Sequence, residues 1–307
     1  MTNRKLIAFG IKFLISILVL WAVYAYLGSP ETLNRLKTAD PVWIGAGAVC
    51  IVLVQVVKSW RFQALGRVLS IQLPFRKCLL AHLIVPILGF VTPGKLGEGA
   101  KIFYLGASKK ELAFLFIIER FQDMLLLLAV AGFGFAFSNF YLISYLVLVA
   151  VILVAIGIFL KLDWVINTIT RFVLKKHIFT ENWFADQSRR LLHPAFAASS
   201  SITLAVWAVT FCSSFCFARS VGVTLSYPNI ALVFSWAVIL GLISSLPGGV
   251  GVREGGITVL FDTIYGIPRA VGMAVAAVNL AVHYIVLTIT AIIGYAVYRS
   301  GQEKTSI

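Results

Sequence analysis

The sequence predicts an all-α polytopic membrane protein, and three observations support this fold class. Of the 307 residues, 60% are hydrophobic and 12% are charged, whereas a soluble domain carries about 25% charged residues. Apolar runs of about 20 residues, the length needed to cross a bilayer, recur along the chain. Two further apolar stretches are interrupted by Pro-Gly motifs. A soluble protein of this composition would lack the polar surface that water requires.

Six apolar runs are long enough to form complete transmembrane helices. We predict these helices over residues 6–28, 42–62, 111–137, 140–160, 197–217 and 269–298. The first run follows Arg4 and Lys5, as the apolar part of a signal peptide does, but it is longer than that part usually is. We therefore expect an uncleaved first span.

Two interrupted segments, residues 76–105 and 228–262, bring the number of hydrophobic segments to eight. Their breaks are rich in proline and glycine, at Pro93, Gly94, Gly97, Pro247, Gly248, Gly249 and Gly251. The piece after each break is too short to cross a bilayer alone. Irregular backbone at membrane depth must be surrounded by protein or line a water-filled cavity. We therefore predict two re-entrant helix–break–helix hairpins.

The net charge of +14 comes from Lys and Arg that lie mostly between the apolar runs. A basic chain can bind nucleic acid, but this distribution is typical of membrane orientation, so we expect no nucleic-acid partner. Positive residues favour the cytoplasmic side, which places both termini in the cytoplasm and the protein in the inner or plasma membrane. Residues 161–195 mix aromatic and basic side chains. We predict an amphipathic connector on the cytoplasmic surface, and a solvated connector is the alternative.

Four cysteines lie within apolar stretches and form no CxxC pair, at Cys50, Cys78, Cys212 and Cys216. We interpret them as small apolar residues and infer neither a disulfide nor a metal site. The glycine-rich breaks contain no GxxxxGK[ST] motif, so a nucleotide-binding loop is excluded. We expect no cofactor.

The chain is one domain with a weak internal repeat, whose halves cover about 42–137 and 197–299. The two proline-glycine motifs correspond, and an offset of 160 residues places Glu119 on Asn279 and Asp123 on His283. Three predicted spans separate the start of one half from the start of the other, so the halves have opposite orientations. Inverted repeats with broken helices are typical of secondary transporters, in which the substrate binds near mid-membrane between the repeats.

Charged residues within apolar segments need an explanation, because each costs at least about 2.5 kcal/mol at the bilayer centre. One interpretation is that they line a substrate cavity and that Arg253, with the hairpin helix N-termini, binds phosphate. The alternative is structural: the acids cap broken helices, Arg253 pairs with one of them, for example Glu98, and the polar cluster of 111–137 is a static clamp. The candidate substrate-binding residues are Lys95, Glu98, Glu119, Arg120, Asp123, Arg253, Glu254, Asn279 and His283.

Four motifs resemble the lysylphosphatidylglycerol synthase transmembrane family, a flippase-like group. They are residues 246–255 (LPGGVGVREG), residues 93–98 (PGKLGE), Glu119-Arg120-x-x-Asp123 and Trp60-Arg61. In fused members, the membrane part is thought to flip an aminoacylated phospholipid made by a synthase domain. Other members stand alone or are joined to glycosyltransferases. We expect a stand-alone member here, which widens the range of lipids to polyprenyl-phosphate-linked sugars.

The resemblance implies a lipid flippase rather than an enzyme. The expected substrate is a phosphate-containing lipid: a phospholipid, an aminoacyl-phospholipid or a polyprenyl-phosphate-linked sugar. Two rival functions remain, a scaffold for a separate lipid-modifying synthase or glycosyltransferase and an intramembrane transferase. The transferase is less favoured because the sequence contains no DxxD, HExxH or GxSxG motif. The sequence leaves the oligomeric state open, with a homodimer as one option.

Overall fold

The computed structural model describes residues 29–90, 92, 95–136, 193–244 and 246–303, together with Trp21 and Ala25. All regular elements in these ranges are helices, as predicted. The predicted spans 6–28 and 140–160 lie outside the described residues, apart from Trp21 and Ala25. So does the predicted connector, apart from residues 193–195.

Three of the described helices are long and apolar enough to cross a bilayer. They are α3 (Pro41–Val68), α10 (Pro194–Ser220) and residues Arg269–Ser300 of α13 (Arg269–Glu303). These helices match the spans predicted at 42–62, 197–217 and 269–298. The predicted span 111–137 is also a helix, α6 (Lys109–Ala136), but charged residues occupy its middle. A short helix, α2 (Pro30–Lys37), precedes α3.

Polar caps and prolines set the starts of the long helices. The Asp40 carboxylate accepts a hydrogen bond of 2.8 Å from the Val42 N–H, and Pro41 is the first residue of α3. At α10, a ring nitrogen of His193 accepts from the Ala195 N–H at 3.0 Å, ahead of Pro194. Both arrangements satisfy an N–H group that the first helical turn leaves unpaired.

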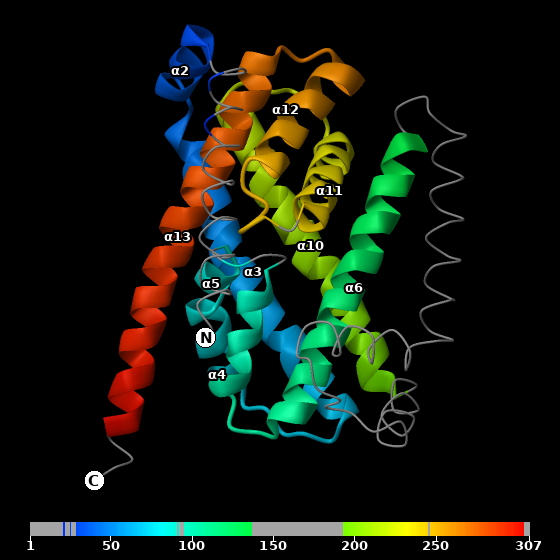
Figure 1. Ribbon diagram of the computed structural model, residues 1–307, viewed down its shortest axis with the longest axis vertical. Coiled ribbons are helices and arrows are strands. Elements are labelled where there is room, and N and C mark those ends of the chain that lie inside the picture. Colours follow the sequence, from blue (N-terminus) through cyan, green and yellow to red (C-terminus); the bar gives the residue numbers. More distant parts are fainter. Residues whose placement is uncertain are drawn as a thin grey trace, which may run out of the picture.

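Helices α3 and α10 pack against each other in opposite directions (Figure 1). The Asp40 N–H donates to the Ser220 carbonyl at 2.8 Å, and near the other end an Arg61 nitrogen lies 3.5 Å from the Thr203 hydroxyl. Between them, Gly47 lies so close to the Phe217 ring that a Cβ would overlap it. Helices α6 and α13 also run in opposite directions. An inverted repeat requires these orientations, although the repeat itself stays a prediction.

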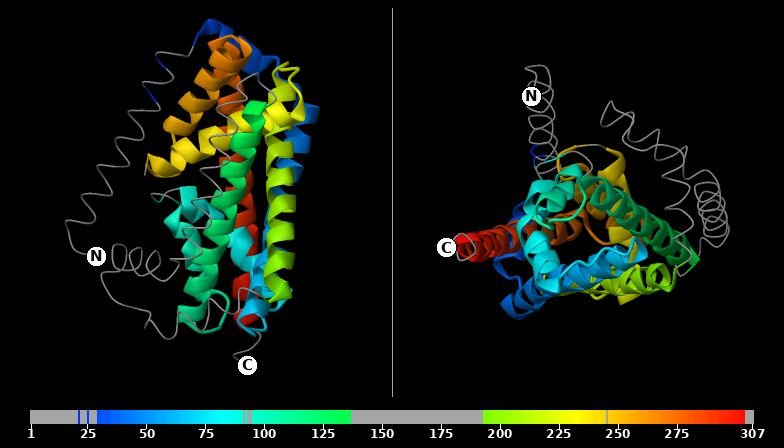
Figure 2. Two further views of the ribbon diagram at one scale, coloured as in Figure 1. Left: turned by 90° about the vertical axis from the view of Figure 1, so that its right-hand side faces the viewer. Right: turned by 90° about the horizontal axis from the view of Figure 1, so that it is seen from below.

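Both interrupted segments contain the predicted helix–break–helix pattern. The first consists of α4 (Phe75–Ile84), α5 (Pro86–Phe90) and the 3₁₀ helix η1 (Leu96–Phe103), and the second of α11 (Tyr227–Ile243) and α12 (Val252–Tyr265). In Figures 1 and 2 the first hairpin lies in the lower half of the bundle and the second in the upper half. Their breaks meet, because the Gly248 N–H lies 3.4 Å from the Thr92 carbonyl. Whether each hairpin re-enters a membrane stays a prediction.

Glycine is required at the second break for two separate reasons. The φ angles of Gly248, Gly249 and Gly251 are 62°, 67° and 88°, which side chains disfavour. A Cβ at Gly248 would also lie 2.7 Å from the Phe90 carbonyl oxygen, and one at Gly249 would lie 2.7 Å from the Cα of Gly241. The close approach of two backbones therefore shapes this break.

The first break differs from the second. Pro93 and Gly94 lie outside the described residues, and the positive φ falls on Lys95, at 57°. The Gly97 N–H donates to the Thr92 hydroxyl at 2.7 Å, and a Cβ on Gly97 would overlap the carbonyl of Leu88. The predicted role of Gly97 in a tight break therefore fits the geometry.

Candidate functional site

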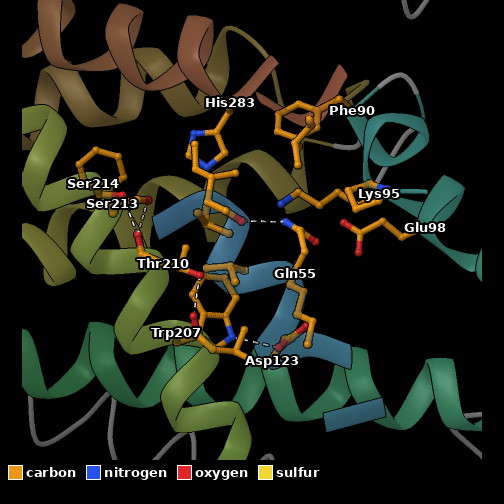
Figure 3. Close-up of a pocket in the computed structure, with 18 of the residues that line it drawn as sticks. Gln55, Phe90, Lys95, Glu98, Asp123, Trp207, Thr210, Ser213, Ser214 and His283 are labelled. Atoms are coloured by element: carbon orange, nitrogen blue, oxygen red, sulfur yellow. Dashed lines mark hydrogen bonds between the residues drawn. The ribbon is translucent and has the colours of Figure 1, made fainter. Parts of the chain in front are cut away.

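A cavity of about 100 Å³ lies where the two hairpins meet the long helices (Figure 3). Residues of α3, α5, η1, α6, α10, α11, α12 and α13 line it. Its apolar lining includes Phe90 and Phe234. Its polar lining consists of Gln55, Lys58, Lys95, Glu98, Arg120, Asp123, Trp207, Thr210, Ser213, Ser214, Arg253, Asn279 and His283.

A buried ion network lies beside this cavity, centred on Arg61 of α3. The Arg61 guanidinium donates to Glu119 at 2.6 Å and to Asp123, both on α6. Lys101 of η1 donates to the other oxygen of Glu119. The ring of His82 on α4 lies 3.7 Å from the same carboxylate. Because Arg61 and Glu119 are fully buried, each depends on the other for charge compensation.

Arg120 connects this network to the cavity. Its guanidinium donates to Glu98 at 2.9 Å and lies 3.5 Å from Asp123. Asp123 also accepts a hydrogen bond of 3.0 Å from the Trp207 indole. Three cations therefore face three carboxylates, so the network is neutral as a whole. Glu119 does not line the cavity, which fits its interpretation as part of a static clamp. Arg120 and Asp123 do line it, which fits their interpretation as residues of a substrate cavity.

The charged pair of the second hairpin is formed within one helix. Arg253 lies 2.7 Å from Glu254, so it pairs with its neighbour rather than with Glu98. Glu254 also accepts from the Gly251 N–H at 2.7 Å and so caps α12. Glu254 does not line the cavity, whereas Arg253 does. The structural alternative, an acid that caps a broken helix and pairs with Arg253, therefore describes Glu254.

The ring of Phe90 lies near two cations at the junction of the breaks. The Arg253 guanidinium carbon is 5.6 Å from the ring centroid, and the Lys95 ammonium is 5.8 Å from it. A ring face attracts cations at such distances. Phe90 thus holds the side chains of both hairpins near one point of the cavity wall.

Several buried polar atoms of the cavity wall lack a hydrogen-bond partner within the described part of the chain. They include Gln55 Oε1 and Asn279 Oδ1. Arg253 Nη2 is also buried and makes no hydrogen bond, although it lies 2.7 Å from Glu254 in the ion pair. The three side chains are 4%, 3% and 6% exposed. Buried polar groups are normally hydrogen-bonded, so such a cluster needs an explanation. A polar ligand or water in the cavity would supply the missing partners.

His283 presents one ring nitrogen for binding. Its Nδ1 lies 2.8 Å from the Asn279 carbonyl, and since a carbonyl only accepts, Nδ1 carries the hydrogen. Nε2 of the neutral ring is then an acceptor. Figure 3 shows the ring extending toward the cavity. The correspondence of His283 with Asp123 in an internal repeat stays a prediction.

The sequence analysis missed two members of the network. Neither Arg61 nor Lys101 is among the candidate substrate-binding residues predicted from the sequence, yet Arg61 is fully buried and Lys101 is 2% exposed. Trp60 is 52% exposed and packs on Phe75, as an interface residue would. The spacing Gln55, Lys58, Arg61 places polar side chains along one face of a predicted span. That spacing is the signal from which Arg61 could have been predicted.

Three of the four cysteines come together between α3 and α10. The sulfur atoms of Cys50, Cys212 and Cys216 all lie within 4.8 Å of one another. Thiols so grouped are ligands of the kind that soft metal ions bind. Cys212 and Cys216 are one helical turn apart in the sequence, but the third member, Cys50, comes from a distant helix and was not predicted to join them. The cluster lies outside the cavity lining.

Comparison with known proteins agrees with this architecture. The family model described as the lysylphosphatidylglycerol synthase TM region matches residues 9–291. The chain belongs to this family. A UPF0104 membrane protein of Methanothermobacter thermautotrophicus is 23% identical over 88% of this chain and 89% of its own length. A second UPF0104 membrane protein, from Methanocaldococcus jannaschii, is 22% identical over 99% of each chain.

Membership of the lysylphosphatidylglycerol synthase TM family confirms the resemblance predicted from the motifs. The matched region includes every residue of the cavity lining and of the ion network. The protein is therefore a multi-pass membrane protein whose cavity lies entirely within the region that defines the family.

Proposed function

We propose that this protein is a lipid flippase of the cytoplasmic membrane, in which the cavity takes a phosphate-containing headgroup while the lipid chains stay in the bilayer. One observation supports the proposal above all: a polar cavity lies inside an apolar helical bundle, at the meeting point of two broken hairpins. Such a cavity is costly in a membrane, and a polar headgroup would supply partners for its unpaired polar atoms.

The chemistry of the lining favours an anionic headgroup. Lys58, Lys95 and Arg253 offer positive charge. The apolar part of the wall, from Phe90 and Phe234, is suited to the glycerol or first chain carbons of a lipid. Arg253 supplies a planar fork that suits phosphate oxygens.

The placement of the hairpins supports the proposal of a route through the membrane. In Figure 1 they extend from opposite ends of the bundle, and their breaks touch at Gly248 and Thr92. In our proposal each hairpin closes one side of the cavity, and small movements of one against the other expose it alternately to each leaflet. The inverted repeat and the re-entrant paths predicted from the sequence belong to this proposal.

The rival functions have less support from the geometry. An intramembrane transferase needs an activated nucleophile. Among the described residues that line the cavity, Thr210 and Ser213 donate their hydroxyl hydrogens to backbone carbonyls, and His283 bonds the Asn279 carbonyl. A scaffold for a separate synthase would not need a polar cavity at mid-bundle.

The test is lipid movement by the purified protein in liposomes that contain a phospholipid with a fluorescent label on one acyl chain, which leaves the headgroup unchanged. An impermeant quencher reports how much label reaches the outer leaflet. We expect the wild-type protein to move the label from the inner leaflet and Val238→Phe, which adds a ring to the cavity wall, to reduce the rate. Val259→Phe is the matched control, because Val259 is 43% exposed on α12 and does not line the cavity.

Two results would contradict the proposal. One is a wild-type protein that moves no more label than protein-free liposomes do. The other is equal rates for Val238→Phe and Val259→Phe. Mass spectrometry of the same lipids separates the transferase, which would change their mass, from the flippase, which leaves it unchanged.

A further inference from the structure

The charges around the cavity do not balance. The side chains that line the cavity, or pair with those that do, include six cations and four carboxylates. The cations are Lys58, Arg61, Lys95, Lys101, Arg120 and Arg253, and the carboxylates are Glu98, Glu119, Asp123 and Glu254. Two positive charges are therefore in excess.

Lys58 and Lys95 account for this excess. The ion network is neutral, and Arg253 pairs with Glu254. Neither Lys58 nor Lys95 forms an ion pair with a described carboxylate, and both are half-buried where they line the cavity. The backbone of Lys95 is in the left-handed conformation, which residues other than glycine adopt at a cost in free energy.

The remaining acids are placed elsewhere. Those in the described ranges lie at helix ends, where Asp40 caps α3 and Asp262 pairs with Arg269. The others belong to the segment that the sequence assigns to the cytoplasmic surface, at Asp163, Glu181 and Asp186. Glu98 attracts both Lys58 and Lys95 but is already paired with Arg120, so these two ammonium groups beside an apolar wall are costly. A ligand with two negative charges would neutralise them.

We infer that the cavity selects a lipid whose headgroup ends in a phosphate monoester, in preference to a phosphodiester with one negative charge or an aminoacylated headgroup with a positive charge. A phosphate monoester has a second pKa of about 6, so it carries close to two negative charges near neutral pH. This inference rests on the proposed function and specifies its substrate class.

The unpaired polar atoms fit the same ligand. Arg253 Nη2 carries two hydrogens and lies 2.7 Å from one Glu254 oxygen, so it keeps a hydrogen for a phosphate oxygen. The Asn279 carboxamide can present its NH₂ after rotation of the terminal bond, and the Gln55 NH₂ would first have to leave the Ile51 carbonyl, 3.4 Å away. A compact tetrahedral phosphate places several acceptor oxygens within a cavity of about 100 Å³. A bulkier glycerol or lysyl ester would have to displace these contacts.

The test compares lipids that share the same acyl chains, at pH 8, in detergent. Phosphatidic acid, phosphatidylglycerol and lysyl-phosphatidylglycerol are titrated against the full chain, and the dissociation constant is measured from the thermal stabilisation. We expect phosphatidic acid to bind about tenfold more tightly than phosphatidylglycerol, the size of one added charged hydrogen bond. We expect lysyl-phosphatidylglycerol to bind most weakly. Lys58→Gln and Lys95→Gln should each reduce the preference, and the double variant should abolish it.

Lys77→Gln is the matched control, since it removes one positive charge from an exposed position outside the cavity lining. The control should keep the full preference. Equal binding of phosphatidic acid and phosphatidylglycerol to the wild type would overturn the inference, and so would a preference that survives in the double variant. This binding test does not depend on transport. A protein that binds phosphatidic acid selectively but moves no lipid would contradict the proposed function and leave the inference standing.

Discussion

The two hairpins are anchored in different ways. In the first, Glu98 and Lys101 of η1 form ion pairs with Arg120 and Glu119 of α6. In the second, Arg253 pairs with Glu254 of the same helix, and the break is shaped by close backbone contacts of glycines. Buried ion pairs thus hold the first hairpin to its neighbours, whereas the second is held at its break by close backbone packing and the Arg253–Phe90 contact, and its ion pair to α13, Asp262–Arg269, is exposed. We therefore expect the second hairpin to be the one that moves during transport.

The largest expected effect comes from breaking the anchor of the first hairpin. Glu119→Gln removes the carboxylate that compensates both Arg61 and Lys101, so these buried cations lose a partner. We expect the free energy of unfolding to fall by about 3–5 kcal/mol, measured by thermal unfolding in detergent. Glu111→Gln, in the first turn of the same helix, should leave the melting temperature unchanged. Equal melting temperatures for the two variants would show that the network does not anchor the hairpin.

The second break should be sensitive to shape rather than to charge. Gly249→Ala forces a side chain into a left-handed conformation and against the backbone of Gly241, and we expect a loss of about 2–4 kcal/mol. Gly266 has a similar φ of 62°, but nothing lies within 4 Å of an added Cβ, so Gly266→Ala should cost only about 1 kcal/mol. A Gly249→Ala protein as stable as Gly266→Ala would contradict the close packing of the second break.

A third pair of variants separates side chains that hold the fold from those available to a ligand. Gln122 donates to Ser199 at 2.8 Å and to Ser200 at 2.9 Å, so Gln122→Leu should lower stability by about 1–3 kcal/mol. The Asn279 oxygen has no described partner, so Asn279→Leu should keep or raise the melting temperature and yet slow lipid movement. If both variants lose stability equally, Asn279 has a structural role after all.

The smallest effect is expected where an ion pair is exposed. Asp262 and Arg269 lie 2.7 Å apart near the C-terminal end of α12, but their side chains are 33% and 52% exposed. Asp262→Asn should change the free energy of unfolding by less than about 1 kcal/mol, because water screens such pairs. A loss as large as that of Glu119→Gln would show that burial is not what makes the network strong.

Apolar length and turn chemistry made much of the fold predictable. The spans at 42–62, 197–217 and 269–298 follow from hydrophobic runs, and both breaks follow from Pro-Gly motifs. The ion network was only partly predictable, because a sequence does not show which buried charge faces which. Arg61 pairs with residues 58 and 62 positions away in the chain. Arg253 lines the cavity, whereas the next residue, Glu254, caps the helix. These different roles could not be predicted either, because they depend on the backbone path through the break.

The central claim is that a lipid headgroup enters the cavity between the hairpins. The most direct measurement is photo-crosslinking in native membranes with a phospholipid that carries a diazirine on its headgroup, followed by peptide mapping. We predict adducts on cavity residues, above all Trp207, Thr210 and His283. Adducts confined to outward-facing residues of α13, such as Ile285 and Ile292, which are 58% and 65% exposed, would contradict the claim.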